Sequence, residues 1–175
     1  MKYCLILLSF FFSSNLFAKT TLFDDIQKIQ GAMILAVKSP RITDSLYSEL
    51  LTRKPVTPLI LAYTGTLEAL KAKHNWNPYQ KIKYVAQSQK TLQKALNAEP
   101  NNLEIRFMRF SIQHYTPEFL GFSKDLVQDR KMIIKQFSQK NYGKADPDLQ
   151  KSIARFMITS DRCTPEEVKL LKKHI

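Results

Sequence analysis

The chain has 175 residues, of which 44% are hydrophobic, and this is enough to build one ordinary domain around a hydrophobic core. The many aromatic and aliphatic residues, without low-complexity tracts, exclude an intrinsically disordered protein, and two cysteines are too few for a disulfide-rich scaffold. The net charge of +12 predicts attraction to anionic surfaces such as lipid headgroups, lipopolysaccharide, polyanionic glycans or nucleic acid. Excess lysine also keeps small helical proteins in solution, so the charge alone does not establish a polyanion site.

The first eighteen residues follow the three-part pattern of a signal peptide. Lys2 precedes an apolar run over 3–12, and the short stretch after it ends at Ala18, a small residue suited to cleavage. The run is too short to span a bilayer, which takes about 20 apolar residues, and no later stretch approaches that length. We therefore expect removal of 1–18 and a single domain over 19–175, without a transmembrane segment, in the periplasm or outside the cell. The alternative is an uncleaved, amphipathic or buried first helix.

Removal of the signal peptide would take Cys4 with it and leave Cys163 as the only cysteine. The adjacent Arg162 and the helix start that follows predict a somewhat lowered pKa for this thiol. A catalytic thiol also needs a positioned base, so we expect Cys163 to be a half-buried structural residue.

Proline pairs mark most of the helix starts. Six of the eight prolines follow a residue that can cap a helix, namely Ser39, Thr57, Asn77, Thr116, Asp146 and Thr164. The side-chain oxygen of such a residue accepts a backbone N–H of the first turn, and proline fits the first helical position because its missing N–H would have had no partner there. Glutamate or glutamine three residues after Asn77 and Thr164 adds the pattern of a capping box.

Helical apolar spacing recurs between these marks. It covers eight segments, at about 22–37, 42–50, 58–73, 82–96, 102–114, 126–137, 149–156 and 168–175. The segment 102–114 is apolar nearly all round, which predicts a central, buried helix. The segment 58–73 carries a seam of small residues that allows close approach of another helix: Ala62, Gly65, Ala69 and Ala72. We predict an all-α domain of seven or eight helices, built as a bundle of antiparallel hairpins.

Residues 78–102 resemble the second helix of a tetratricopeptide repeat and the start of the next repeat. Leu92, Ala95 and Pro100 lie at the large-apolar, alanine and proline spacings of that motif. The resemblance covers about 25 residues, and the tryptophan, leucine-glycine and tyrosine positions of the repeat's first helix are not reproduced. It implies a helical-hairpin, α-solenoid-like arrangement. Helix-hairpin packing without common descent explains the same spacings.

No catalytic, cofactor or metal signature is present in the sequence. It contains no phosphate-binding glycine-rich loop, no zinc helix of the H-E-x-x-H type and no dedicated nucleic-acid motif. The three histidines, His74, His114 and His174, each fall near the predicted end of a helix, where a cation complements the helix dipole. We therefore predict no catalytic residues, no cofactor and no metal ion.

A polar cluster is the first candidate site. Arg106 and Arg109 interrupt the most apolar helix and share a stripe with Gln113. A buried arginine needs an acidic or carbonyl partner, because an unpaired buried charge is very costly. The candidate partners are Glu68, Asp125 and Asp129. Such a network is usually structural, and the alternative is an anion pocket in which Arg106 and Arg109 bind a carboxylate or phosphate.

A basic face is the second candidate site. The stretch between Glu68 and Glu99 holds six lysines and no acidic residue, and Lys83, Lys90 and Lys94 lie on one helical stripe away from the apolar one. Nearby aromatic residues could stack on sugars or bases or lie at a membrane interface: Trp76, Tyr79 and Tyr84. The alternative is a solvated lysine face beside ordinary core aromatics.

Three functions are compatible with these patterns. The first is an exported, non-catalytic binding or scaffold module of the periplasm or cell envelope, with a protein partner. The second is a basic protein that associates with anionic envelope components through Lys83, Lys90 and Lys94. The third is an enzyme that uses Glu68, Arg106 and Arg109. A concave apolar groove favours the first, a continuous positive surface the second, and a pocket with converging arginine and carboxylate tips the third.

Overall fold

The structure is a computed structural model and describes residues 25–175. The predicted signal peptide and its cleavage site lie outside these described residues. Within them the regular elements are helices, and no strand is present. The predicted all-α class is therefore confirmed.

The helices follow one another with short connections. Residues 25–36 are helical. Seven α-helices come after them, with a short 3-10 helix before α6 and another at the C-terminus: α2 (Pro40–Thr52), α3 (Pro58–His74), α4 (Pro78–Ala98), α5 (Leu103–Tyr115), η1 (Glu118–Leu120), α6 (Leu126–Ser138), α7 (Pro147–Thr159), α8 (Pro165–Leu171) and η2 (Lys172–His174). This agrees with the predicted bundle of seven or eight helices. Among residues 25–175, no helix combines the length and the apolar composition that a membrane crossing requires.

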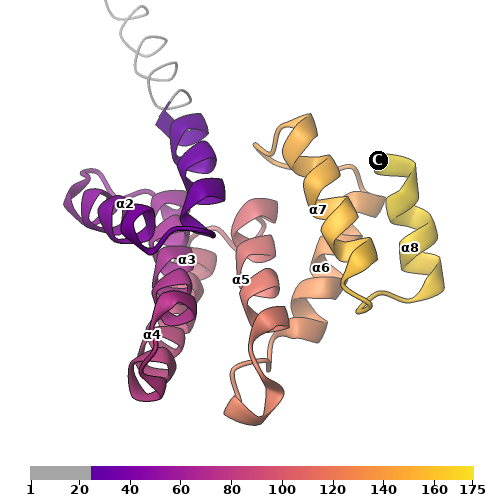
Figure 1. Ribbon diagram of the computed structural model, residues 1–175. Helices are drawn as coiled ribbons and strands as arrows, with labels where there is room; N and C mark the ends of the chain where they lie inside the picture. Colours follow the sequence, from indigo (N-terminus) through magenta and orange to yellow (C-terminus); the bar gives the residue numbers. More distant parts are fainter. Residues whose placement is uncertain (1–24) are drawn as a thin grey trace, which may run out of the picture.

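Helix α5 stands between two groups of helices (Figure 1). On one side α3 and α4 pack along each other as a hairpin, and α2 packs on α3. On the other side α6 packs on α5, and α7, α8 and η2 pack together. Because α5 contacts α3, α4 and α6, it joins the two groups.

Two hydrophobic cores meet at α5. Ile105 and Met108 belong to a core shared with the N-terminal helices, whereas Leu103 and Phe110 belong to a core shared with α6, α7 and α8. Phe107 is only partly buried and packs against the edge of the second core. A helix that serves two cores must be apolar on opposite faces, which is why the apolar pattern of 102–114 extends nearly all round. The prediction of a central, buried helix is confirmed.

The predicted small-residue seam brings α3 close to α4. A Cβ atom built at Gly65 would lie 3.0 Å from Cγ and 3.3 Å from the backbone nitrogen of Leu92, which is tighter than nine in ten real Cβ contacts. Glycine at this position therefore sets how near the two helices can approach.

Five of the six proline pairs begin an α-helix. Ser39, Thr57, Asn77, Asp146 and Thr164 each cap their helix with a side-chain oxygen, and Thr164 with Glu167 forms the full capping box. The pair at Thr116 is different, because the Thr116 hydroxyl donates to the carbonyl oxygen of Ile112 at the end of α5. The segment directly after this pair forms only the short 3-10 helix η1, which ends at Gly121 with a positive φ of 72°. The prediction that most of these pairs are helix starts is therefore confirmed, and the pair at Thr116 is the exception.

Candidate functional site

The two arginines of α5 meet a single carboxylate on α6. Asp129 Oδ1 accepts hydrogen bonds from Arg106 Nη1 and from Arg109 Nη2, both at 2.7 Å, and Asp129 Oδ2 accepts from Arg109 Nε at 2.7 Å. All three side chains are buried. Helical spacing explains the geometry, since residues three apart on α5 present their side chains to the same partner helix. Asp129, one of the candidate partners, is thus the common partner of both arginines.

Further polar groups complete this network. Arg106 also donates to the carbonyl oxygen of Pro100, and Arg109 donates to the side chain of Gln93. Asp125 lies 3.6 Å from Arg109 Nη1 and accepts from Gln113 at 3.0 Å. Burial acts to lower the pKa of Arg109, but the hydrogen bonds and charge of Asp129 outweigh it and hold the pKa above its ordinary value. The guanidinium group of Arg109 therefore stays charged. Five of the six guanidinium nitrogens of the two arginines donate inside the protein, and Arg106 Nε is buried without a hydrogen-bond partner among the described residues.

Glu68 lies in a different cluster. Its Oε1 accepts from Gln87 at 2.7 Å and from Tyr47 at 3.3 Å, which links α3 to α4 and α2. Its other oxygen, Oε2, is buried without a hydrogen-bond partner among the described residues. The structure brings Arg106 and Arg109 together but does not add Glu68 to them, so the predicted grouping of these three residues is not formed.

A second buried carboxylate, Glu104, connects three helices. Its Oε1 accepts from the hydroxyl of Tyr63 on α3 and, at 3.1 Å, from Gln30 in the first helix. Burial raises the pKa of Glu104, while the hydrogen bonds from Tyr63 and Gln30 oppose the shift without cancelling it. The sequence shows Glu104 interrupting an apolar helix, but nothing local in the sequence identifies Tyr63 as its partner 41 positions earlier.

The three lysines of the basic face are exposed on α4. The side chains of α4 that are buried lie on the opposite side of the helix, which packs on α3 and α5: Ser88, Leu92, Ala95 and Leu96. Within residues 25–175, Lys83, Lys90 and Lys94 take part in no ion pair. Gln87, which lies between them in sequence, instead turns toward Glu68.

The three aromatic residues near this face have separate surroundings. Trp76 is 89% exposed and Tyr79 is 87% exposed, at the connection from α3 to α4. Tyr84 is half-buried, and its ring lies 5.5 Å from the ammonium group of Lys71. Trp76 and Tyr79 are therefore not core aromatics, whereas Tyr84 belongs to the contact between α3 and α4.

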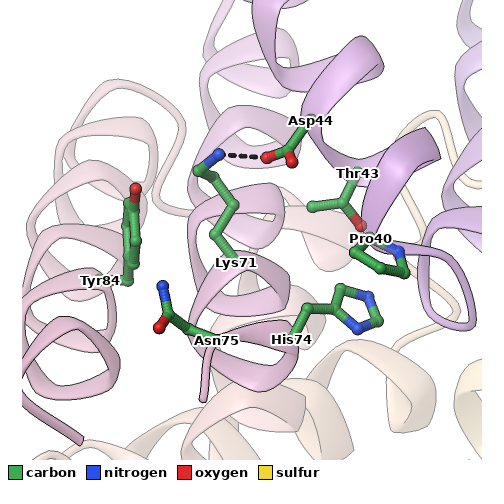
Figure 2. Close-up of a pocket in the computed structure, with 7 residues that line it drawn as sticks. All are labelled: Pro40, Thr43, Asp44, Lys71, His74, Asn75 and Tyr84. Carbon is green, nitrogen blue, oxygen red and sulfur yellow. Dashed lines mark hydrogen bonds and ion pairs between the residues drawn. The ribbon is translucent and has the colours of Figure 1, made fainter. Parts of the chain in front are cut away.

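A small pocket lies among α2, α3 and α4. Figure 2 shows Tyr84 on one side, Asp44 and Thr43 on the other, and Lys71 between them, ion-paired with Asp44. The cavity measures about 140 Å³, and its remaining lining residues are Pro40, His74 and Asn75. Its polar groups are largely used internally, because Thr43 and His74 both bond to the carbonyl oxygen of Ala36. This arrangement stabilises the contact between α2 and α3.

A larger cavity of about 550 Å³ lies near the C-terminus. It opens between the end of α6, the loop after it and the last helices, and is lined by Phe137, Ser138, Lys140, Tyr142, Leu170, Lys173 and His174. Two of these lining residues, Tyr142 and His174, form a hydrogen bond of 3.0 Å with each other. The histidine of this lining is therefore held by a tyrosine.

Among residues 25–175, Cys163 and the three histidines lie in separate parts of the fold. Cys163 is half-buried, and burial raises its pKa to about 11, so the expected lowering of its pKa is wrong. Burial outweighs the nearby Arg130, which acts in the opposite direction. His74, His114 and His174 end separate helices, as expected, but burial lowers the pKa of His114, so it is not the cation that the dipole argument requires. Among residues 25–175, no three His, Cys, Asp or Glu side chains are placed to share a metal ion.

No protein-family model, curated protein sequence or solved structure matches the chain, so the tetratricopeptide resemblance of 78–102 stays a prediction.

Proposed function

We propose that this protein is an exported, non-catalytic helical module that attaches to anionic components of the cell envelope. The observation that carries the proposal is the exposed row formed by Lys83, Lys90 and Lys94 on the solvent face of α4. We call these three residues the basic face.

The basic face has the properties of a contact surface for anions. Its lysines have no ion-pair partner among the described residues, and between Glu68 and Glu99 the chain has no acidic residue to compete for them. Together with the net charge of +12, this concentrates positive potential on one side of the α3–α4 hairpin. The proposal of export rests on the sequence pattern of residues 1–18.

The arrangement of the arginines supports a non-catalytic role. Arg106 and Arg109 make five hydrogen bonds to Asp129, Pro100 and Gln93, and all five hold α5 in place. Binding a substrate would require breaking buried charge-assisted hydrogen bonds, which is costly. Glu68 lies in another cluster, so it does not complete an acid–base site with them.

Retention on anionic supports tests this proposal. The parent protein, beginning at Lys19, is applied to a heparin-type resin and to anionic phospholipid vesicles, beside the variant K83Q/K90Q/K94Q. We expect the variant to lose most of the binding, and salt to weaken the parent's binding steeply, because exposed charges are screened within about 8 Å at physiological ionic strength. The matched control is K124Q/K131Q/K135Q, which removes the same charge from exposed positions at α6.

The two variants separate a specific surface from diffuse charge. Loss of binding in the first variant and not in the second supports the basic face. Equal retention of both variants and the parent would mean that the lysines serve solubility and that the proposal is wrong. A partner protein captured by the parent and by K83Q/K90Q/K94Q alike would favour a scaffold role through another surface.

A further inference from the structure

We infer that the anionic component is a phospholipid bilayer, on which α4 lies lengthwise while Trp76 and Tyr79 enter the headgroup region. This inference rests on the proposed function and names the partner of the basic face. It adds Trp76 and Tyr79 to the contact surface, because attraction between charges alone would not involve these two residues.

The exposure of Trp76 and Tyr79 is built into the start of α4. Asn77 caps the helix by accepting the backbone N–H groups of Tyr79 and Gln80, and its own N–H donates to the side chain of Asn75. This local network fixes the backbone on both sides of Pro78. The two rings are thereby presented to solvent on an ordered turn, at 89% and 87% exposure.

Tyr79 continues the row of lysines. Successive residues of an α-helix are rotated by about 100°, so Tyr79, Lys83, Lys90 and Lys94 fall within about 60° of one another around α4. At 1.5 Å per residue this row is roughly 22 Å long. Tyr79 at one end and the three lysines further along thus lie on one straight face of α4. Such a face fits a flat surface.

The chemistry of this face favours a bilayer over a soluble polyanion. Tryptophan and tyrosine have an apolar ring with a polar group, and such residues concentrate at the headgroup level of membranes. Lysines beside them attract anionic headgroups, each by a factor of about five. Lys81 is also exposed beside Tyr79, and Ile82 is exposed about one turn further along the helix. A glycan or nucleic acid can also pair with the lysines and stack on the two rings, but it offers no apolar layer for the exposed Ile82.

The chain carries its own reporter for this contact. Trp76 is the only tryptophan, so its fluorescence describes this position and no other. The protein from Lys19 onward is titrated with phosphatidylcholine vesicles containing 30% phosphatidylglycerol, with pure phosphatidylcholine vesicles, and with soluble heparin. We expect the emission maximum of Trp76 to move to shorter wavelength and iodide quenching to fall, with the anionic vesicles only.

Variants assign the contributions of charge and aromatic residues. We expect K83Q/K90Q/K94Q to weaken binding to anionic vesicles about 100-fold, and Tyr79→Ser to weaken it by about three- to tenfold while heparin binding stays unchanged. The control is Phe119→Ser in η1, which removes an aromatic ring of similar exposure, 86%, far along the chain and leaves vesicle binding unchanged.

Failure of this inference differs from failure of the proposed function. Co-sedimentation with anionic vesicles without a shift in Trp76 emission overturns the inference and leaves the proposed function standing. The same holds if heparin produces the same shift, because the aromatics then contact a glycan. No binding to vesicles or to heparin overturns both.

Discussion

Asp129 on α6 binds Arg109 on α5 through two hydrogen bonds, from Nε to Oδ2 and from Nη2 to Oδ1, each 2.7 Å long. Asp129 is fully buried and also accepts from Arg106. One carboxylate on α6 therefore compensates two buried positive charges on α5, the helix that joins the two cores.

We expect Asp129→Asn to lower the free energy of unfolding by about 3–5 kcal/mol, because it leaves Arg106 buried without a charged partner and Arg109 with only Asp125 at 3.6 Å. Urea unfolding measures the change. Asp125→Asn is the matched control on the same network, since Asp125 is partly exposed and 3.6 Å from Arg109, and we expect it to cost about 1 kcal/mol or less. Similar losses for both variants would contradict the assignment of Asp129 as the common partner.

The packing of α5 predicts unequal roles for its two central phenylalanines. Phe110 is fully buried, whereas Phe107 is partly buried and meets Phe156 edge to face with 5.2 Å between ring centroids. We expect Phe110→Ala to cost about 3–5 kcal/mol of unfolding free energy and Phe107→Ala distinctly less. Thermal or urea unfolding measures both variants. A larger loss of stability for Phe107→Ala than for Phe110→Ala would contradict this packing, because the face of α5 that carries Phe107 would then be the more deeply buried one.

Glu104 predicts a specific pH dependence of stability. Burial holds its pKa above the ordinary value of 4.5, so above pH 4.5 the folded state binds more protons at this site than the unfolded state. The contribution of Glu104 to stability is therefore fully present below pH 4.5 and is lost as pH rises through the raised pKa. We expect the stability of the parent relative to Glu104→Gln, measured by urea unfolding at a series of pH values, to fall as the pH rises above 4.5. A difference that is constant or that increases with pH would contradict this.

Export predicts the N-terminus of the protein in cells. If residues 1–18 are a signal peptide, protein recovered from the envelope or the medium begins at or near Lys19, and N-terminal sequencing determines this directly. Recovery of the chain with Met1 intact in the cytosolic fraction would be the opposite result.

The helix boundaries were predictable from sequence because capping is local chemistry. A capping side chain and a proline act on the backbone within three residues, so Ser39, Thr57 and Asp146 could be interpreted without knowing any neighbour in space. Thr116 has the same local pattern, but its hydroxyl bonds to the preceding helix, and this competing use is not visible in the sequence.

The buried polar contacts were predictable only in part. The spacing of Arg106 and Arg109 shows that they share one face of their helix, and the acidic residues of the next helix, Asp125 and Asp129, were among the candidate partners. The location of Glu68 depends on how α2, α3 and α4 meet, since its donors, Tyr47 and Gln87, come from two other helices. Cys163 illustrates the same limit, because the adjacent Arg162 suggested a lowered thiol pKa, whereas burial and the charge of Glu167 raise it.

Lysine labelling is the most direct test of the basic face. The protein is acetylated briefly with a water-soluble reagent, free and bound to anionic vesicles, and the extent of modification at each lysine is determined by mass spectrometry. We expect Lys83, Lys90 and Lys94 to be protected on binding, while Lys131, Lys135 and the exposed lysines of α7 and α8 react equally in both states. Uniform protection of all exposed lysines, or protection confined to α6–α8, would contradict the account.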